Sequence, residues 1–151
     1  MNKLNNFDNK TSFFKYLKKL FQDSNTIILT GSMVHKSIKN FSDFDLEVYG
    51  KSIKKPYYEL VWISGKLVLL SAYFYKFEKG ISKAPPKGTK IIKGEYNTAI
   101  NKRTPATLYS EGKYSSKEVI RRECQLVADF LFKYFRSKNK KYLQYVQKRI
   151  N

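Results

Sequence analysis

The sequence is poor in cysteine, proline and glycine, with one, four and seven of them in 151 residues. The single cysteine, Cys124, can form no internal disulfide and offers no cysteine-rich metal site. With 42% hydrophobic and 16% aromatic residues, the chain has ample material for a core, which argues against wholesale disorder. The length predicts a single domain over residues 1–151. Apolar neighbours such as Val127 and Leu131 predict that the Cys124 thiol is buried.

Long hydrophobic runs are missing as well. No run approaches the roughly 20 apolar residues that a membrane-spanning helix needs, so we expect no membrane partner. The first ten residues, MNKLNNFDNK, lack the apolar core of a signal peptide. These two absences together predict a cytoplasmic protein.

Acidic residues are scarce, at 12 against 30 lysines and arginines, which gives a net charge of +18. A surplus of this size usually accompanies a polyanionic partner, such as nucleic acid or a nucleotide. A lysine-rich surface that reflects a biased genome or a hot habitat is the alternative explanation. The charge alone does not decide between the two.

The pattern of the N-terminal part predicts a helix followed by a buried strand. Residues 11–22 carry apolar side chains at helical spacing. Residues 26–30, TIILT, form a short apolar run rich in β-branched side chains, which is typical of a central strand. The run ends at Gly31-Ser32, and residues 33–39 can form a short helix.

Residues 43–49 alternate strictly between acidic and apolar side chains. Asp43, Asp45 and Glu47 fall on one face of the predicted strand, and the intervening apolar residues fall on the other. Residues 57–63 and 66–77 then predict a hairpin with Ser64-Gly65 as its tight turn. Both faces of that hairpin are largely apolar, so we expect it to be covered on both sides, with Trp62 in the core.

The segment 79–114 is rich in lysine, glycine and proline and predicts irregular loops with one short strand at Ile91-Ile92. Its lysines either contact phosphates or are simply solvated; they are Lys83, Lys87, Lys90 and Lys93. Residues 115–136 form the clearest predicted helix, with a capping-box pattern at Ser115 and Glu118 and an apolar stripe along one side. That stripe consists of Ile120, Val127, Leu131 and Phe135.

A shorter helix at 141–150 completes the C-terminal segment 115–151. From Phe130 onward the chain has seven basic residues and no acidic one. The order of helix, strand, short helix, acidic strand, hairpin and helix predicts an α+β domain with a mixed sheet, flanking helices and a long C-terminal helix.

The chemistry concentrates in Gly31-Ser32 and, after ten intervening residues, Asp43-Phe44-Asp45. A glycine-serine pair where a strand gives way to a helix exposes backbone N–H groups and a hydroxyl that suit phosphate. Two carboxylates at i and i+2 on a strand point to the same side, roughly 7 Å apart. They repel each other unless a hard divalent cation bridges them. The two elements together can hold a metal–triphosphate beside an attacking hydroxyl.

This arrangement resembles the polymerase-beta-type nucleotidyltransferase superfamily. The family signature is an apolar strand ending in Gly-Ser, about ten residues, and then Asp-x-Asp in an apolar strand; here it reads IILTGSMVHKSIKNFSDFDLEV. The resemblance covers residues 11–77 as a catalytic core. It implies that Gly31 and Ser32 contact the nucleoside triphosphate and that Asp43 and Asp45 hold Mg²⁺ or Mn²⁺.

The family usually adds a third carboxylate from a neighbouring strand. The natural candidate is Glu59, because a charge within that apolar strand needs a reason. Glu47, which continues the acidic face, and a structural, lysine-paired role for Glu59 are the alternatives. The only histidine, His35, either approaches the phosphates or is packed or solvent-facing.

The resemblance implies a metal-dependent enzyme that transfers a nucleoside monophosphate from a triphosphate, ATP being expected, to a hydroxyl. The acceptor can be RNA, a protein or a small molecule, and the charge favours RNA. One alternative is a non-catalytic nucleic-acid-binding protein on a degenerate scaffold. Another is a component of a toxin–antitoxin pair or larger complex, with the helix at 115–136 docking a protein partner.

Overall fold

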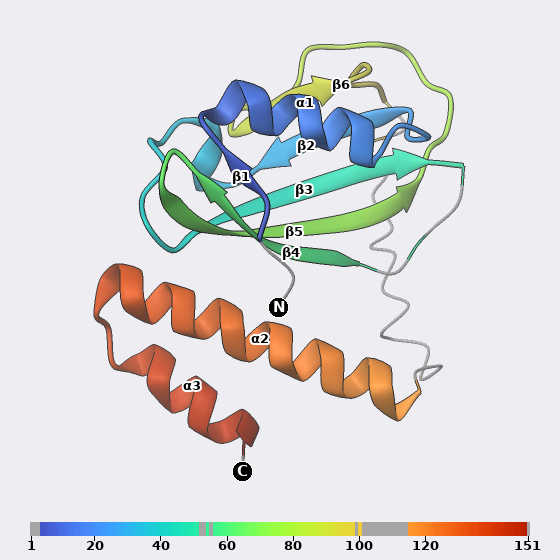
Figure 1. The fold of residues 1–151 in the computed structure, drawn as a ribbon. Coiled ribbons are helices and arrows are strands. Elements are labelled where there is room, and N and C mark those ends of the chain that lie inside the picture. The colour runs from blue at the N-terminus through green and yellow to red at the C-terminus, as the bar shows by residue number, and fades with distance from the viewer. Residues whose placement is uncertain (1–3, 52–53, 55, 99, 101–114, 151) are drawn as a thin grey trace.

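The fold was analysed in a computed structural model that describes residues 4–51, 54, 56–98, 100 and 115–150, apart from the side chain of Glu118. It is an α+β fold with a mixed sheet and a long C-terminal helix, as predicted (Figure 1). The elements in chain order are β1 (Asn6–Phe7), α1 (Lys10–Leu20), β2 (Thr26–Thr30), the 3-10 helix η1 (Ser32–Val34), β3 (Ser42–Gly50), β4 (Tyr57–Ile63), β5 (Lys66–Lys76), β6 (Thr89–Lys93), α2 (Ser116–Ser137) and α3 (Lys141–Ile150).

The six strands form one sheet in the order β1-β4-β5-β3-β2-β6. The β1–β4 and β3–β5 pairs are parallel, and the other neighbours are antiparallel. The predicted hairpin is confirmed: β4 and β5 pair around Ser64 and Gly65, whose φ angles are 51° and 67°. A type I′ turn requires positive φ at both of its central residues, so Ser64 adopts a backbone conformation that glycine accepts more easily.

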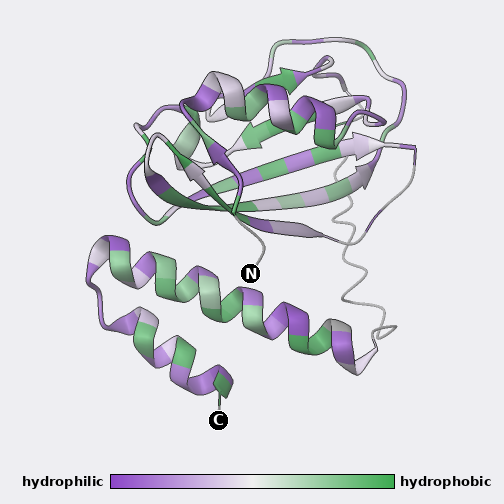
Figure 2. Cartoon of the chain, viewed as in Figure 1, coloured by the Kyte–Doolittle hydropathy of each residue, from purple (hydrophilic) through white to green (hydrophobic). Residues whose placement is uncertain are grey.

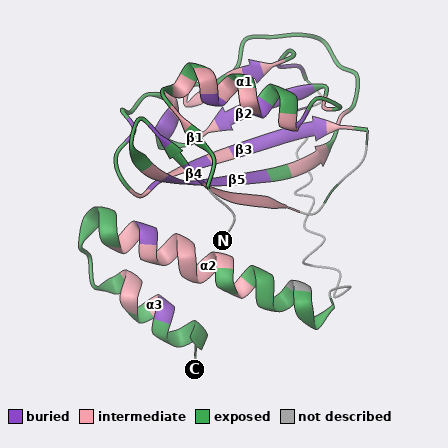
Figure 3. Ribbon diagram, viewed as in Figure 1, coloured by how far each residue is buried: buried purple, intermediate pink, exposed green. Residues whose placement is uncertain are grey.

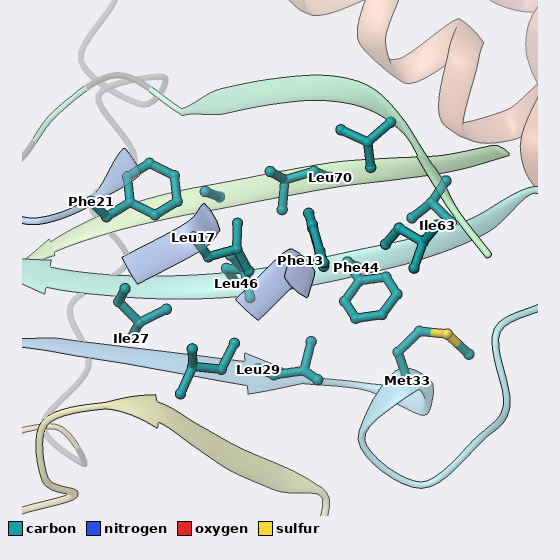
Figure 4. Close-up of a cluster of buried hydrophobic side chains, with 14 of the residues drawn as sticks. Phe13, Leu17, Phe21, Ile27, Leu29, Met33, Phe44, Leu46, Ile63 and Leu70 are labelled. Carbon is teal, nitrogen blue, oxygen red and sulfur yellow. The ribbon is translucent and has the colours of Figure 1, made fainter. Parts of the chain in front are cut away.

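The side chains of β3 alternate between two faces of the sheet, which have different environments. Phe44, Leu46 and Val48 are buried under α1, which contributes Phe13 and Leu17 to the same cluster (Figure 4). The rings of Phe13 and Phe44 meet edge to face with 5.4 Å between their centroids, a spacing usual for aromatic pairs. The other side of β3 carries Asp43, Asp45 and Glu47, called the acidic face below.

The strand β6 is longer than the predicted Ile91-Ile92 and contains two of the four lysines assigned to a loop patch. The Lys90 ammonium lies 5.3 Å from the ring centroid of Phe14 on α1. Lys93 donates a 2.6 Å hydrogen bond to the carbonyl of Gln22, just beyond the end of α1. These two lysines therefore belong to a strand, and they help β6 to pack beside α1.

Gly94 sets how closely β6 can approach the chain that leads into β2. A Cβ at Gly94 would lie 2.1 Å from the carbonyl oxygen of Asn25, and the residue also has a φ of 73°. Thr26 beside it donates from its hydroxyl to the carbonyl of Glu95. Any side chain at position 94 would push the two segments apart.

The two C-terminal helices pack on each other and meet the sheet beside β3. Phe130 of α2 contacts Tyr145 of α3, with ring centroids 5.1 Å apart. Phe132 and Phe135 of α2 contact Phe41, which precedes β3, at 5.4 and 5.0 Å. No helix within the described residues has both the length and the apolar character to cross a membrane.

The first turns of α2 remain open to solvent, although they carry apolar side chains (Figures 2 and 3). Ile120 is 63% exposed, and Cys124 is exposed, so the prediction of a buried thiol is wrong. Trp62 is also wrong as a core residue, at 37% exposed. A helical stripe or an apolar strand face predicts which side chains can be buried, but not whether another surface reaches them.

Candidate active site

Gly31 directly follows β2 and has a backbone conformation that suits glycine alone. Its φ of 76° and ψ of −160° lie in a region that L side chains rarely adopt. A Cβ built there would lie 3.6 Å from the Asp45 Oδ2 atom. The antiparallel pairing of Thr30 with Asp45 explains this closeness, because Gly31 is the next residue along. The carboxylate of Asp45 therefore lies beside the bare backbone of Gly31.

The segment after Gly31 contains less helix than predicted. Only the three residues Ser32–Val34 form a 3-10 turn, whereas a helix at 33–39 was expected. A single turn has too few aligned peptide units for a helix dipole to bind phosphate. What remains is an exposed Gly31 backbone and the exposed hydroxyl-bearing residue Ser32. His35, next to that turn, is exposed.

Lysine side chains hold the irregular segment between Gly31 and β3 in place. Lys10 of α1 donates hydrogen bonds to the carbonyls of Met33, at 3.3 Å, and Lys36, at 2.9 Å. Lys66 donates to the carbonyl of Ile38 at 2.9 Å. Because carbonyls of an irregular segment need donors, these contacts fix the position of the Gly31-Ser32 turn relative to the sheet.

Asp43 and Asp45 share the acidic face, and the surroundings of Asp45 disfavour its charged form. Burial, followed by the charges of Asp43 and Asp129, raises the pKa of Asp45 to about 6, against the opposing effect of Lys133 and Arg136. Asp43 accepts a hydrogen bond from Arg136 of α2. A half-buried carboxylate beside two other carboxylates is a place where an added cation is stabilised.

Glu59 does not join these aspartates. It pairs with Leu70 of β5, and Leu70 pairs with Phe44, which puts Glu59 on the face of the sheet that α1 covers. Its carboxylate accepts hydrogen bonds from the hydroxyls of Tyr16, at 2.8 Å, and Tyr57, at 2.9 Å. The assignment of Glu59 as a third metal ligand is therefore corrected. The partners of the Glu59 carboxylate are two hydroxyls and the Asn5 amide, whereas the alternative interpretation expected a lysine.

We expect Glu59→Gln to lower the free energy of unfolding by about 1–3 kcal/mol without changing metal affinity. Glutamine fills the same space, but it loses the charge that strengthens the two tyrosine hydrogen bonds, of which the bond from Tyr16 links α1 to β4. Urea unfolding and Mn²⁺ titration of the same variant measure the two effects. Glu78→Gln, at an exposed position, is the control. Loss of Mn²⁺ binding in Glu59→Gln alone would contradict this structural role.

Two further acids lie at the acidic face, and the sequence indicated only the first of them, Glu47. Glu47 is buried on that face and accepts a 2.9 Å hydrogen bond from the Tyr49 hydroxyl. Asp129 of α2 acts on Asp45 through its charge and accepts a 2.6 Å hydrogen bond from Lys133. A possible signal for Asp129 was its place as the last acidic residue of the chain, four positions before a lysine.

The donor set fits Mg²⁺ as a site completed by substrate. Among the described residues, no three His, Cys, Asp or Glu side chains lie close enough to hold a metal by themselves. Mg²⁺ is commonly bound by one or two carboxylates together with substrate phosphates and waters, and Asp43 and Asp45 match that requirement. No protein-family model matches the chain, and no match is found among curated proteins.

Without metal, we expect Asp45→Asn to stabilise the protein at neutral pH by about 2–3 kcal/mol, since a raised pKa of about 6 corresponds to roughly 1.4 kcal/mol per unit above 3.8. A carboxyl whose pKa is raised on folding destabilises the folded state only in its ionised form. Its destabilising effect is therefore complete above about pH 6 and absent below about pH 4. Melting curves in EDTA across this range measure the difference between variant and wild type. An equal gain at pH 4 and pH 8 would refute it, with Asp8→Asn as the exposed control.

Proposed function

We propose that the protein is a metal-dependent nucleotidyltransferase that uses a nucleoside triphosphate, with ATP as the expected substrate. Asp43 and Asp45 hold Mg²⁺ or Mn²⁺, and the Gly31 backbone and the Ser32 hydroxyl contact the triphosphate. The observation that carries the proposal is the 3.6 Å approach of the Asp45 Oδ2 atom to the Cβ position of Gly31. It supports a site where a phosphate at the glycine turn and a cation at the aspartates are neighbours.

The reaction joins an acceptor hydroxyl to the α-phosphate. The hydroxyl oxygen bonds to the α-phosphorus, the bond to the β-phosphate oxygen breaks, pyrophosphate leaves and the hydroxyl proton passes to solvent. When bound, the metal supplies positive charge that offsets the charge of the triphosphate. Gly31 leaves room for a phosphate because it has no side chain, and Ser32 donates a hydrogen bond to a phosphate oxygen. The lysine-fixed segment after the turn keeps both groups in position.

The charge of +18 favours RNA as the acceptor. Incubation with α-labelled ATP and Mg²⁺, beside the other three nucleotides, tests the activity with total RNA, tRNA-like RNA and the protein itself as acceptors. We expect labelled RNA, and EDTA should stop the labelling. If no acceptor is labelled and Mn²⁺ does not bind, the enzyme assignment is overturned.

A non-catalytic nucleic-acid-binding protein is the second candidate, favoured by the ion pair between Arg136 and Asp43, which occupies a carboxylate that an enzyme would use. Binding would then fall with salt, with a log–log slope near −0.7 per phosphate contacted on a single strand. Titration of labelled RNA at two salt concentrations measures this slope. Salt-sensitive binding without labelling would select this candidate over the enzyme.

A protein partner, as in a toxin–antitoxin pair, is a further proposal that rests on α2. Val119 and Ile120 are apolar and exposed on its first turns (Figure 3). Co-purification alone would not identify such a partner, so the transfer assay takes precedence.

A further inference from the structure

The helix α2 brings two cations to the acidic face. Asp129, Lys133 and Arg136 stand at spacings of four and three residues, which puts them on one side of the helix. Arg136 is paired with Asp43, and Lys133 is paired with Asp129. Lys133 also interacts electrostatically with both Asp43 and Asp45. Three carboxylates and two cations from segments far apart in the sequence therefore face one another.

The pair between Arg136 and Asp43 uses the carboxylate that the proposed metal requires. A guanidinium and a divalent cation compete for the same oxygen lone pairs and repel each other at close range. The side chains of Arg136 and Asp43 are 31% and 18% exposed, so water can reach the pair and the arginine can leave it. Surface pairs of this kind contribute little to stability, which makes the exchange accessible.

Arg136 stays near the site even when the pair opens, because aromatic contacts anchor its helix. Phe132 and Phe135 hold this end of α2 against Phe41, which lies two residues before Asp43. A metal-bound triphosphate would bring phosphate oxygens to this position. The planar guanidinium fork matches phosphate better than it matches a carboxylate already committed to a metal.

We propose that Arg136 is an exchangeable counter-ion, paired with Asp43 when the site holds no metal and bound to the triphosphate when the metal–nucleotide complex is present. Lys133 supplies a second positive charge to the same phosphates. This inference rests on the proposed nucleotidyltransferase function and makes Arg136 a nucleotide-binding residue of that site. It also means that metal alone binds more weakly than metal with nucleotide, because only the nucleotide gives the displaced arginine a new partner.

Arg136→Gln tests the exchange, because it should change two affinities in opposite directions. Binding of Mn²⁺ alone, measured from the electron paramagnetic resonance signal of the free ion, should become about fivefold tighter, since a competing cation is removed. Binding of a non-hydrolysable ATP analogue with Mg²⁺ should become about tenfold weaker or more, since a charge-assisted contact is lost. Arg136→Lys should keep Mn²⁺ affinity near that of wild type and bind the analogue with intermediate affinity.

Arg149→Gln is the matched control, because Arg149 forms a similar 2.6 Å ion pair with Glu123 between α3 and α2, outside the site. It should change neither affinity, and melting curves of both variants show whether the fold is kept. If wild type binds Mn²⁺ and analogue but Arg136→Gln changes neither, or weakens both, the exchange is overturned and the proposed function stands. If wild type binds no Mn²⁺, or Asp45→Asn binds it equally well, the proposed function fails and the exchange fails with it.

Discussion

Asp45→Asn and Asp43→Asn are each expected to reduce metal-dependent nucleotide transfer by about 1,000-fold or more. Loss of one carboxylate weakens metal binding and removes charge stabilisation worth several kcal/mol in the transition state, and each 1.4 kcal/mol is a factor of ten in rate. Asparagine keeps the shape of the side chain, so the change isolates the charge. Incorporation of labelled nucleotide at saturating Mg²⁺ measures the effect.

Asp23→Asn is the control for this pair of variants, because Asp23 is an exposed aspartate that lies in the turn between α1 and β2. It should retain wild-type transfer. Melting curves should show that Asp45→Asn is folded and, without metal, more stable than wild type. Full activity in either site variant would exclude Asp43 and Asp45 as the metal ligands, even if the protein proves to transfer nucleotides.

Phe44→Ala is expected to lower the free energy of unfolding by about 3–5 kcal/mol, the usual cost of removing a buried phenylalanine ring. Phe44 is fully buried and contacts Phe13 of α1 edge to face. It stands between Asp43 and Asp45 in the sequence, and its side chain points into the cluster between β3 and α1 (Figure 4). Urea unfolding measures the loss.

Trp62→Ala is the comparison for Phe44→Ala, because Trp62 is an aromatic residue of the same sheet that is partly exposed. It should cost much less, since a smaller share of its surface leaves water on folding. A small loss in Phe44→Ala would mean that α1 does not rely on this face of the sheet. Phe44→Ala should lower stability, whereas the aspartate variants should lower the transfer rate. The comparison therefore tests whether one face of β3 serves stability and the other serves the proposed chemistry.

Local patterning was enough to predict most of the elements. The strands β2 and β3, the β4–β5 hairpin and the helices α1, α2 and α3 were predicted to within a few residues, because each carries a clear period or turn signal. The two-residue strand β1 has no period to recognise. The short helix after Ser32 was overestimated because lysine side chains from distant segments, and not helical hydrogen bonds, satisfy its carbonyls.

The neighbourhood of Gly31 and Asp45 was also accessible from the sequence. Strict alternation puts Asp43 and Asp45 on one face, and an antiparallel pair of adjacent strands brings the end of β2 to the start of β3. Both faces of β4 are apolar, so alternation could not tell which face Glu59 takes. Its side is decided by the register of β4 on β5, and its partners Tyr16 and Asn5 lie far away in the sequence.

The meeting of α2 with the acidic face could not be predicted. Arg136 and Asp43 are 93 residues apart, and the pattern of α2 indicates only that one of its sides is apolar. The charges of Lys133 and Arg136 fitted a solvated basic terminus equally well. Which part of the helix meets the sheet depends on Phe132, which was outside the predicted stripe and yet is buried, alone among the described side chains of α2.

The strand order has a consequence for synthesis on the ribosome. Among the residues that the structure describes, every strand of the sheet lies before residue 94, whereas α2 begins at Ser116. Chains emerge from the N-terminus at about 5–20 residues per second, and their early segments fold as they become available. The nascent chain can therefore complete its sheet, with Asp43 and Asp45 uncovered, before Arg136 has been translated. An interval of a second or more then precedes the arrival of the helix that closes on them.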